Sequence, residues 1–230
     1  MTLRNCLLAS AMVFTLSAGL TPAGAVTLTG DYGAWLTGAG GSAFPTTTYA
    51  PSATPADFST IVTVSNVTLV GGGSFTTNIP VEVDQVGTSW GTWSGGYTGH
   101  VLWSGYDSAS SSGIDTIELA LTGLYAFGLE IEPNAFSTLS ISVLLNTSES
   151  LAQDINGDGG AKFFGYYGNG VTGLTITAPT GQSFAFGNFR SVPVVPLPAA
   201  FPLFAGAIAA FGAFGHWRHR RSRRAEARLP

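Results

Sequence analysis

Apolar and polar residues alternate with a period of two residues through most of the chain between residues 26 and 190. This alternation places apolar side chains on one face of an extended strand and polar side chains on the other. No stretch in this region keeps the spacing of an amphipathic helix. The pattern predicts strands at residues 61–70, 79–86, 114–121, 124–132, 139–145, 163–167, 174–178 and 184–189.

Glycine and proline separate these predicted strands at intervals of roughly 8 to 15 residues. Examples are the turns at residues 71–73, 157–160 and 179–181. Many short strands joined by such turns are typical of an antiparallel β-sandwich. We therefore expect an all-β, jelly-roll-like sandwich over residues 26–190.

The composition supports this class and excludes several others. Gly, Ser and Thr together make about a third of the chain, whereas charged residues make 10%, well below the roughly 25% of ordinary globular proteins. A coiled coil, a helical bundle and a charged disordered chain are therefore excluded. Between residues 26 and 195, Lys162 and Arg190 stand against twelve carboxylates, a formal charge of −10. Such an acidic domain repels phosphates, so we expect no nucleic-acid partner.

The N-terminus has the pattern of a secretory signal peptide over residues 1–25. Arg4 precedes a short apolar run, and Ala23 and Ala25 give the small-x-small form that signal peptidase accepts. We expect export through the secretion translocon and cleavage after Ala25. The alternative is an uncleaved anchor, which the short apolar run disfavours. Cys6 is the only cysteine, so the mature domain is expected to have no disulfide.

The C-terminus contains three segments in series. A proline-rich linker is expected at residues 191–198, a transmembrane helix at 199–217 and a basic cytoplasmic tail at 218–230. The arginines that set this topology by the positive-inside rule are Arg218, Arg220, Arg221, Arg223 and Arg224. The alternative is a buried core helix with a solvated basic tail, but a soluble helix does not need an apolar surface on all sides.

At the junction of linker and helix stand Val195, Pro196, Leu197, Pro198 and Ala199. This motif, followed by the apolar stretch and the arginines, resembles the PEP-CTERM sorting signal of Gram-negative bacteria in its VPLPA form. The resemblance covers about 35 residues. It implies a substrate of exosortase, a membrane-embedded protease, in species that make exopolysaccharide. It also implies an inner-membrane-anchored precursor that reaches the cell surface or extracellular matrix.

A second resemblance covers roughly residues 114–190. The segments 127–134, 156–159, 163–167 and 184–189 are similar to the extracellular β-sandwich domain often found upstream of this sorting signal. The resemblance implies a surface or matrix protein and carries over no catalytic residues.

Asp154, Asn156 and Asp158 place oxygen ligands at the first, third and fifth positions of an EF-hand-like loop, with Gly159 at the sixth. The twelfth position is Gly165, so the bidentate glutamate is missing. Calcium binding would need ligands from elsewhere, and Glu130 or Glu132 are candidates. The alternative is a polar hairpin turn, which Asn-Gly and Asp-Gly favour.

Two catalytic arrangements are also weighed and disfavoured. Glu130 and Glu132 could be glycosidase carboxylates, but both point the same way from one strand, and the preferred interpretation is a solvated polar strand face. His100 is the only histidine of the mature domain, and the serines near it, Ser89, Ser94 and Ser104, show no Gly-x-Ser-x-Gly elbow. A Ser-His-Asp triad is therefore not expected.

Five aromatic residues within a stretch rich in glycine and serine are candidates for stacking on sugar rings: Trp90, Trp93, Tyr97, Trp103 and Tyr106. The alternative places these rings in the core. We expect a non-enzymatic surface protein, structural or adhesive in an exopolysaccharide or biofilm setting. The alternative function is a carbohydrate-binding module, with or without calcium, that recognises matrix glycan.

Overall fold

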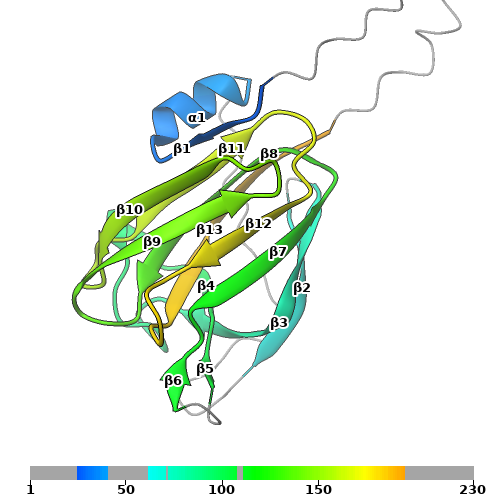
Figure 1. Ribbon diagram of the computed structural model, residues 1–230. Helices are drawn as coiled ribbons and strands as arrows, with labels where there is room; N and C mark the ends of the chain where they lie inside the picture. Colours follow the sequence, from blue (N-terminus) through cyan, green and yellow to red (C-terminus); the bar gives the residue numbers. More distant parts are fainter. Residues whose placement is uncertain (1–24, 41–61, 71, 108–110, 195–230) are drawn as a thin grey trace, which may run out of the picture. The chain divides into compact units, whose positions relative to one another are not determined.

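The computed structural model describes residues 25–40, 62–70, 72–107 and 111–194 (Figure 1). Contacts divide the chain into two units, Met1–Pro193 and Val194–Pro230, and the fold below is that of the first. The sorting motif, the expected membrane helix, the basic cluster and all of the expected signal peptide except Ala25 lie outside the described residues. In the part that is described, no helix has the length and apolar character needed to cross a bilayer.

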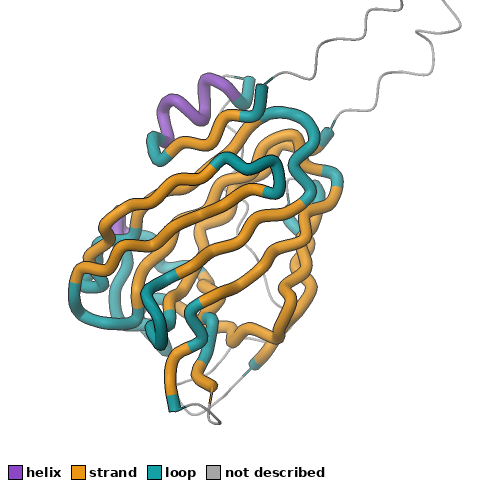
Figure 2. Tube along the Cα trace, viewed as in Figure 1, coloured by secondary structure: helices purple, strands orange, loops and turns teal. Residues whose placement is uncertain are grey.

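The described chain is mostly antiparallel β-structure, so the all-β prediction is confirmed. Figure 2 shows one short α-helix and a 3-10 turn among many strands. The elements are β1 (Thr27–Thr29), α1 (Tyr32–Gly38), β2 (Thr63–Thr68), β3 (Ser74–Gln85), η1 (Ser94–Gly96), β4 (His100–Trp103), β5 (Tyr106–Asp107), β6 (Ser112–Gly113), β7 (Thr116–Thr122), β8 (Leu124–Pro133), β9 (Thr138–Leu145), β10 (Ser150–Asn156), β11 (Lys162–Tyr167), β12 (Gly173–Thr177) and β13 (Phe184–Pro193).

One continuous hydrogen-bonded sheet encloses the core. Its strands follow the order β1-β11-β8-β13-β4-β3-β7-β12-β9-β10, and β2 pairs with β3 beside this path. The long strand β3 joins the two halves, because its start pairs with β7 and its end pairs with β4. The half β10-β9-β12-β7 thereby lies in front of the half that contains β8 and β13 (Figure 1).

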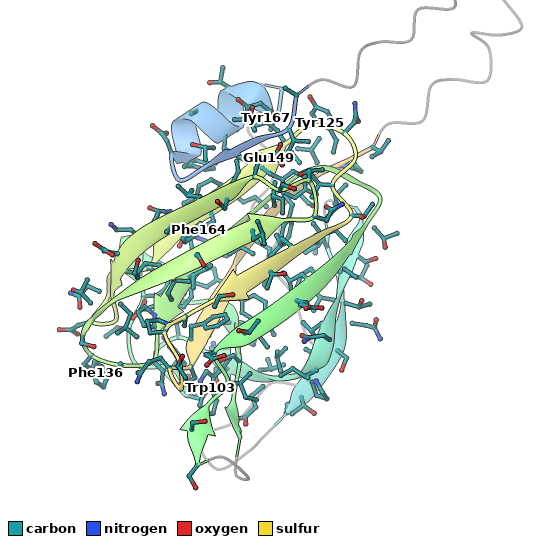
Figure 3. All side chains as sticks on the ribbon, in the orientation of Figure 1. Trp103, Tyr125, Phe136, Glu149, Phe164 and Tyr167 are labelled. Carbon is teal, nitrogen blue, oxygen red and sulfur yellow. The ribbon has the colours of Figure 1, made fainter. Side chains whose placement is uncertain are left out.

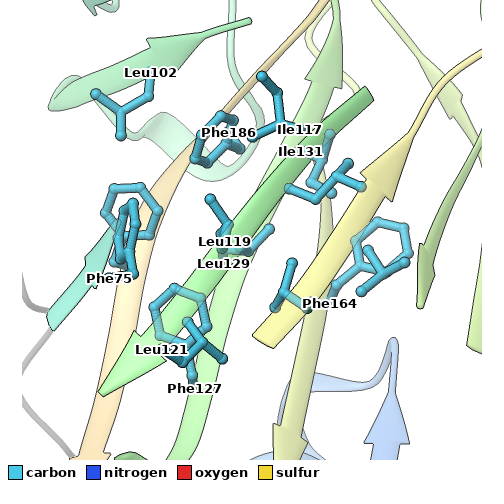
Figure 4. Packing of buried hydrophobic residues seen from close by; sticks show 14 of the residues in the cluster. Phe75, Leu102, Ile117, Leu119, Leu121, Phe127, Leu129, Ile131, Phe164 and Phe186 are labelled. Carbon is cyan, nitrogen blue, oxygen red and sulfur yellow. The ribbon is translucent and has the colours of Figure 1, made fainter. Parts of the chain in front are cut away.

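The core lies between these halves and consists of the apolar side of each alternating strand. In β7, Ile117, Leu119 and Leu121 are buried while the residues between them are not. They share one cluster with Phe127, Leu129 and other inward residues of β8 (Figure 4). Full burial of each such side chain contributes about 1.5–3 kcal/mol, so this cluster is the main source of stability.

The helix α1 covers the outer face of β8 and β11, and the sequence pattern does not predict it. Asp31 caps its N-terminus, with Oδ1 accepting a hydrogen bond from the Ala34 amide at 3.0 Å. Trp35 is fully buried, and its indole Nε1 donates to the carbonyl of Tyr166 at 2.9 Å. A seven-residue helix that buries one large side chain is too short to show a period.

Two further predictions are corrected. Strands β1, β4 and β10 were not expected, because β1 and β4 are short and β10 exposes most of its residues. The linker was expected from Ser191, but β13 continues to Pro193. Ser191 is buried and its hydroxyl donates to the carbonyl of Gly72 at 3.1 Å, which fixes the first part of the expected linker to the sheet.

Gly165→Ala is expected to destabilise the domain by about 1–3 kcal/mol. Its added Cβ would lie 2.5 Å from a ring atom of Phe163 and 2.6 Å from one of Trp35, so both rings must move. Gly91→Ala is the control, because nothing lies within 4 Å of a Cβ there. Urea unfolding measures both changes, and equal stability of the two variants would contradict the packing of Trp35 over β11.

Candidate functional site

Beyond α1, the outer face of β8 carries two carboxyl groups that are withdrawn from water. Phe127, Leu129 and Ile131 of β8 point into the core, so Glu130 and Glu132 point outward. Glu132 is nevertheless 0% exposed, and the side chain of Glu130 is only 15% exposed. The interpretation of a solvated strand face was wrong, because the loop between β3 and β4 covers this part of the sheet.

Glu130 is held by three donors. Its Oε1 accepts from Asn188 Nδ2 at 2.8 Å and from Arg190 Nη2 at 3.1 Å, and its Oε2 accepts from Trp93 Nε1 at 2.9 Å. The guanidinium of Arg190 also lies 4.6 Å from the ring centroid of Tyr32 in α1. This network ties the helix, the covering loop and β13 to one carboxylate, and it indicates a structural role for Glu130.

Glu132 is only partly held. Its Oε1 accepts from Thr92 Oγ1 at 2.7 Å and from the Gly159 amide at 3.3 Å. Its Oε2 is buried and makes no hydrogen bond to any described residue. Burial raises the pKa of Glu132, the nearby Asp158 raises it further, and hydrogen bonding from Thr92 and from the backbone amides of Gly159 and Ala161 opposes this shift.

Two hollows meet at the turn between β8 and β9, and both are lined by Asn134. We call them together the Asn134 cleft. The first hollow, of about 300 Å³, is lined by Ser89, Trp90, Gly91, Thr92, Glu132, Pro133, Asn134, Phe136 and Gly157. The second, of about 220 Å³, is lined by Trp103, Gly113, Asn134, Ala135, Gly181, Gln182 and Ser183.

The Asn134 cleft combines aromatic rings with unsatisfied polar atoms. Phe136 is 78% exposed at the turn. Trp103 is half-buried, and its Nε1 is a buried donor with no partner among the described residues. Figure 3 shows Trp103 and Phe136 at the end of the sheet remote from Tyr125 and Tyr167. A buried donor and a buried acceptor beside rings are the groups that a polyhydroxylated ligand satisfies.

The aromatic residues considered as candidates for stacking on sugar rings are divided between two roles. Trp90 and Trp93 are both 8% exposed and pack with Val86 and Val101 in a second apolar cluster. Tyr97 stacks obliquely on Trp93, with an interplanar angle of 50°, and its hydroxyl donates to the carbonyl of His100. Trp90 and Trp103 also line the Asn134 cleft. The side chain of Tyr106, in β5, lies outside the description.

The residues expected to bind calcium do not form a continuous loop. Asp154 lies within β10 opposite Ser140, and Asn156 ends that strand. The Asn156 Oδ1 accepts from the Asp158 amide at 3.2 Å, which is the bond of an Asx turn. Across the described residues, no group of three or more acidic, histidine or cysteine side chains is placed to hold a metal. Calcium binding stays a prediction.

His100 and its neighbouring serines serve the fold. His100 begins β4 and pairs with Gln85. Each serine hydroxyl bonds the backbone: Ser89 accepts from the Gln85 amide, Ser94 donates to the Ala161 carbonyl and Ser104 donates to the Ile114 carbonyl. These bonds tie the hydroxyls of Ser89, Ser94 and Ser104 to the backbone of the fold.

The largest described hollow, of about 420 Å³, lies elsewhere, over the outer face of β7, β12 and β9. Its lining is mainly threonine, asparagine and leucine, with Glu118 as the only charged residue and no aromatic ring. Without a ring to stack on or a buried unpaired group, this hollow offers less for ligand recognition than the Asn134 cleft.

Sequence reasoning did not identify Asn134, Phe136 and Gln182 as site residues. The Pro133-Asn134 pair indicates a turn. Phe136 follows three residues after Pro133, and phenylalanine is a residue type that usually lies in the core and seldom at a turn. The sequence therefore contains a signal for Phe136, but nothing in it shows that Phe136 lines the same cleft as Trp90 and Trp103.

Comparison with protein-family models gives no match, and comparison with curated proteins gives none either. The resemblance of the C-terminus to a sorting signal therefore rests on the residues named above.

Glu132→Gln is expected to flatten the dependence of stability on pH. Because the pKa of Glu132 is raised from 4.5 in the folded protein, the folded state binds more protons than the unfolded chain above pH 4.5, and stability falls as pH rises through this window. The pKa values of Glu82 and Asp84 are also raised, so both residues make stability fall with rising pH in the same way. The test therefore uses the difference in the free energy of unfolding between Glu132→Gln and the native protein. Urea unfolding between about pH 4 and pH 8 tests this, with Glu118→Gln as control. Parallel curves for the native protein and Glu132→Gln would contradict it.

Proposed function

We propose that the chain is an exported, non-enzymatic surface or matrix protein. Signal peptidase removes residues 1–25, and exosortase processes the C-terminal signal at the cell envelope of a Gram-negative bacterium. The protein then stays at the surface or enters an exopolysaccharide matrix. The observation that carries this proposal is the ordered series at the C-terminus: the motif from Val195 to Ala199, the apolar segment and the arginines.

The limits of the sheet support this division of the chain. Strand β1 begins at Thr27, two residues after Ala25, and β13 ends at Pro193, two residues before Val195. In the sequence, one processing signal therefore precedes the first paired strand and the other follows the last. A protease that reads an extended segment needs such residues outside a hydrogen-bonded ladder.

The direction of β13 supports display of the Asn134 cleft. Phe184 pairs with Pro133, next to the cleft, whereas Pro193 pairs with Leu124 at the other end of β8. A strand of this length spans about 30 Å. In the sequence, the sorting signal thus follows the end of β13 that is remote from the cleft.

Glycan binding at the Asn134 cleft is the second candidate function, and the cleft is the observation that favours it. Exposed Phe136 and half-buried Trp103 offer ring faces to sugar C–H groups. The unpaired Trp103 Nε1 and Glu132 Oε2 offer a donor and an acceptor. The first hollow, of about 300 Å³, reaches the lower limit for ligand pockets, and the second adds about 220 Å³ beside it.

Processing at the C-terminus is tested by mass spectrometry of the protein from surface and medium fractions of its host. We expect the residues that follow the Val195–Ala199 region to be lost only when exosortase is present. Replacing Pro196 and Pro198 by alanine should reduce the processed fraction, because the motif loses its extended backbone. A C-terminus that ends at Pro230 in every fraction would mean a permanently anchored protein.

Glycan binding is tested by quenching of tryptophan fluorescence with soluble exopolysaccharide. Trp103→Ala and Phe136→Ala should each weaken binding about tenfold, which is about 1.4 kcal/mol, because each removes a ring of the cleft. Leu144→Ala is the matched control, since Leu144 is 47% exposed in the hollow over β9. Binding that survives both aromatic substitutions would exclude the Asn134 cleft as the glycan site.

A further inference from the structure

The Asn134 cleft has an uneven electrostatic character. Among all the residues that line its two hollows, Glu132 is the only one with an ionisable side chain. The two basic residues of the domain, Lys162 and Arg190, line neither hollow, and Arg190 is committed to Glu130. A ligand in the cleft therefore meets one carboxyl group and no compensating cation.

The carboxyl group of Glu132 is also incompletely satisfied. Its Oε1 takes both of the hydrogen bonds described above, while its Oε2 is buried with no described partner. A buried charged oxygen without a donor costs free energy that a correctly placed donor recovers. An ammonium group supplies both the hydrogen bond and the opposite charge, and such charge-assisted bonds are roughly twice as strong as neutral ones.

The surroundings act in the same direction. Asp158 lies close enough to add negative potential at Glu132, and the region between residues 26 and 195 carries a formal charge of −10. An anionic sugar in the cleft would be repelled by both, whereas a cationic sugar would be attracted. The site therefore discriminates by charge as well as by shape.

We propose that the Asn134 cleft binds a glycan that carries a free amino group, with the ammonium at Glu132 and the sugar ring against the aromatic side chains of the cleft. This inference rests on the proposed glycan-binding function and names its ligand class: amino sugars of a deacetylated polysaccharide, not uronate polymers.

The first test measures how tightly three oligosaccharides of equal length bind to the purified protein. Calorimetric titration uses a glucosamine oligomer, its N-acetylated counterpart and a glucuronate oligomer, at one ionic strength and at a pH where the amine is protonated. We expect the glucosamine oligomer to bind at least about tenfold more tightly than the N-acetylated one. The glucuronate oligomer should give no measurable heat.

Two matched variants identify the group responsible. Glu132→Gln keeps the size of the side chain and removes its charge, so the preference for the amine should disappear. Glu118→Gln makes the same charge change on the exposed outer face of β7 and should retain the preference. Trp103→Phe keeps a ring and removes the indole donor. It should therefore weaken the binding of every sugar that binds, without changing the order of their affinities. Thermal unfolding of each variant verifies that it is folded.

The outcomes separate this inference from the function on which it rests. Equal binding of the amine and N-acetyl oligomers overturns the ligand class and leaves glycan binding intact. A preference for the amine that persists in Glu132→Gln overturns the role of Glu132 and assigns the effect to the overall charge. Absence of binding by all three oligomers overturns the ligand class, and the fluorescence titration with exopolysaccharide then decides whether the cleft binds any glycan.

Discussion

The half-sheet formed by β11, β8 and β13 carries buried apolar side chains on both faces, and this constraint determines much of the molecule. One face packs in the main core, so the other must be covered by elements from outside the sheet. At one end α1 places Trp35 over Ala126 and Phe163; at the other, the loop after β3 places Trp90 and Trp93 over Ala185. The Asn134 cleft lies where this second cover meets the turn after β8.

The two carboxyl groups beneath the cover differ in how fully hydrogen-bond donors of the protein satisfy them. Glu130 is surrounded by Trp93, Asn188 and Arg190, so its charge is used within the fold. Glu132 lies two residues further along β8, at the edge of the cover, where only one of its oxygens has protein partners. The two glutamates lie on the same strand face beneath the same loop, and they differ in how many donors the fold supplies to each carboxyl group.

Local sequence pattern predicts those parts of the fold that depend on neighbouring residues alone. The alternation of Ile117, Leu119 and Leu121 predicted β7, because one face of that strand remains open to solvent. The same alternation in β8 led to the interpretation of Glu130 as part of a solvated strand face. A polar residue that faces water and one that faces a covering loop give the same alternation in the sequence. The aromatic run behaved likewise: Trp90 and Trp93 both join the cover, and only the folded chain brings Trp90 to the hollow that Phe136 also lines.

The residues that line the Asn134 cleft all lie between the two expected processing signals in the sequence. Its lining comes from the loop after β3, from the turn after β8 and from the residues before β13. The N-terminal strand β1 is at the far edge of the half-sheet, separated from β8 by β11, and β13 ends beside Leu124. Cleavage before Thr27 or after Pro193 removes no residue of the cleft and none of the groups that hold Glu132.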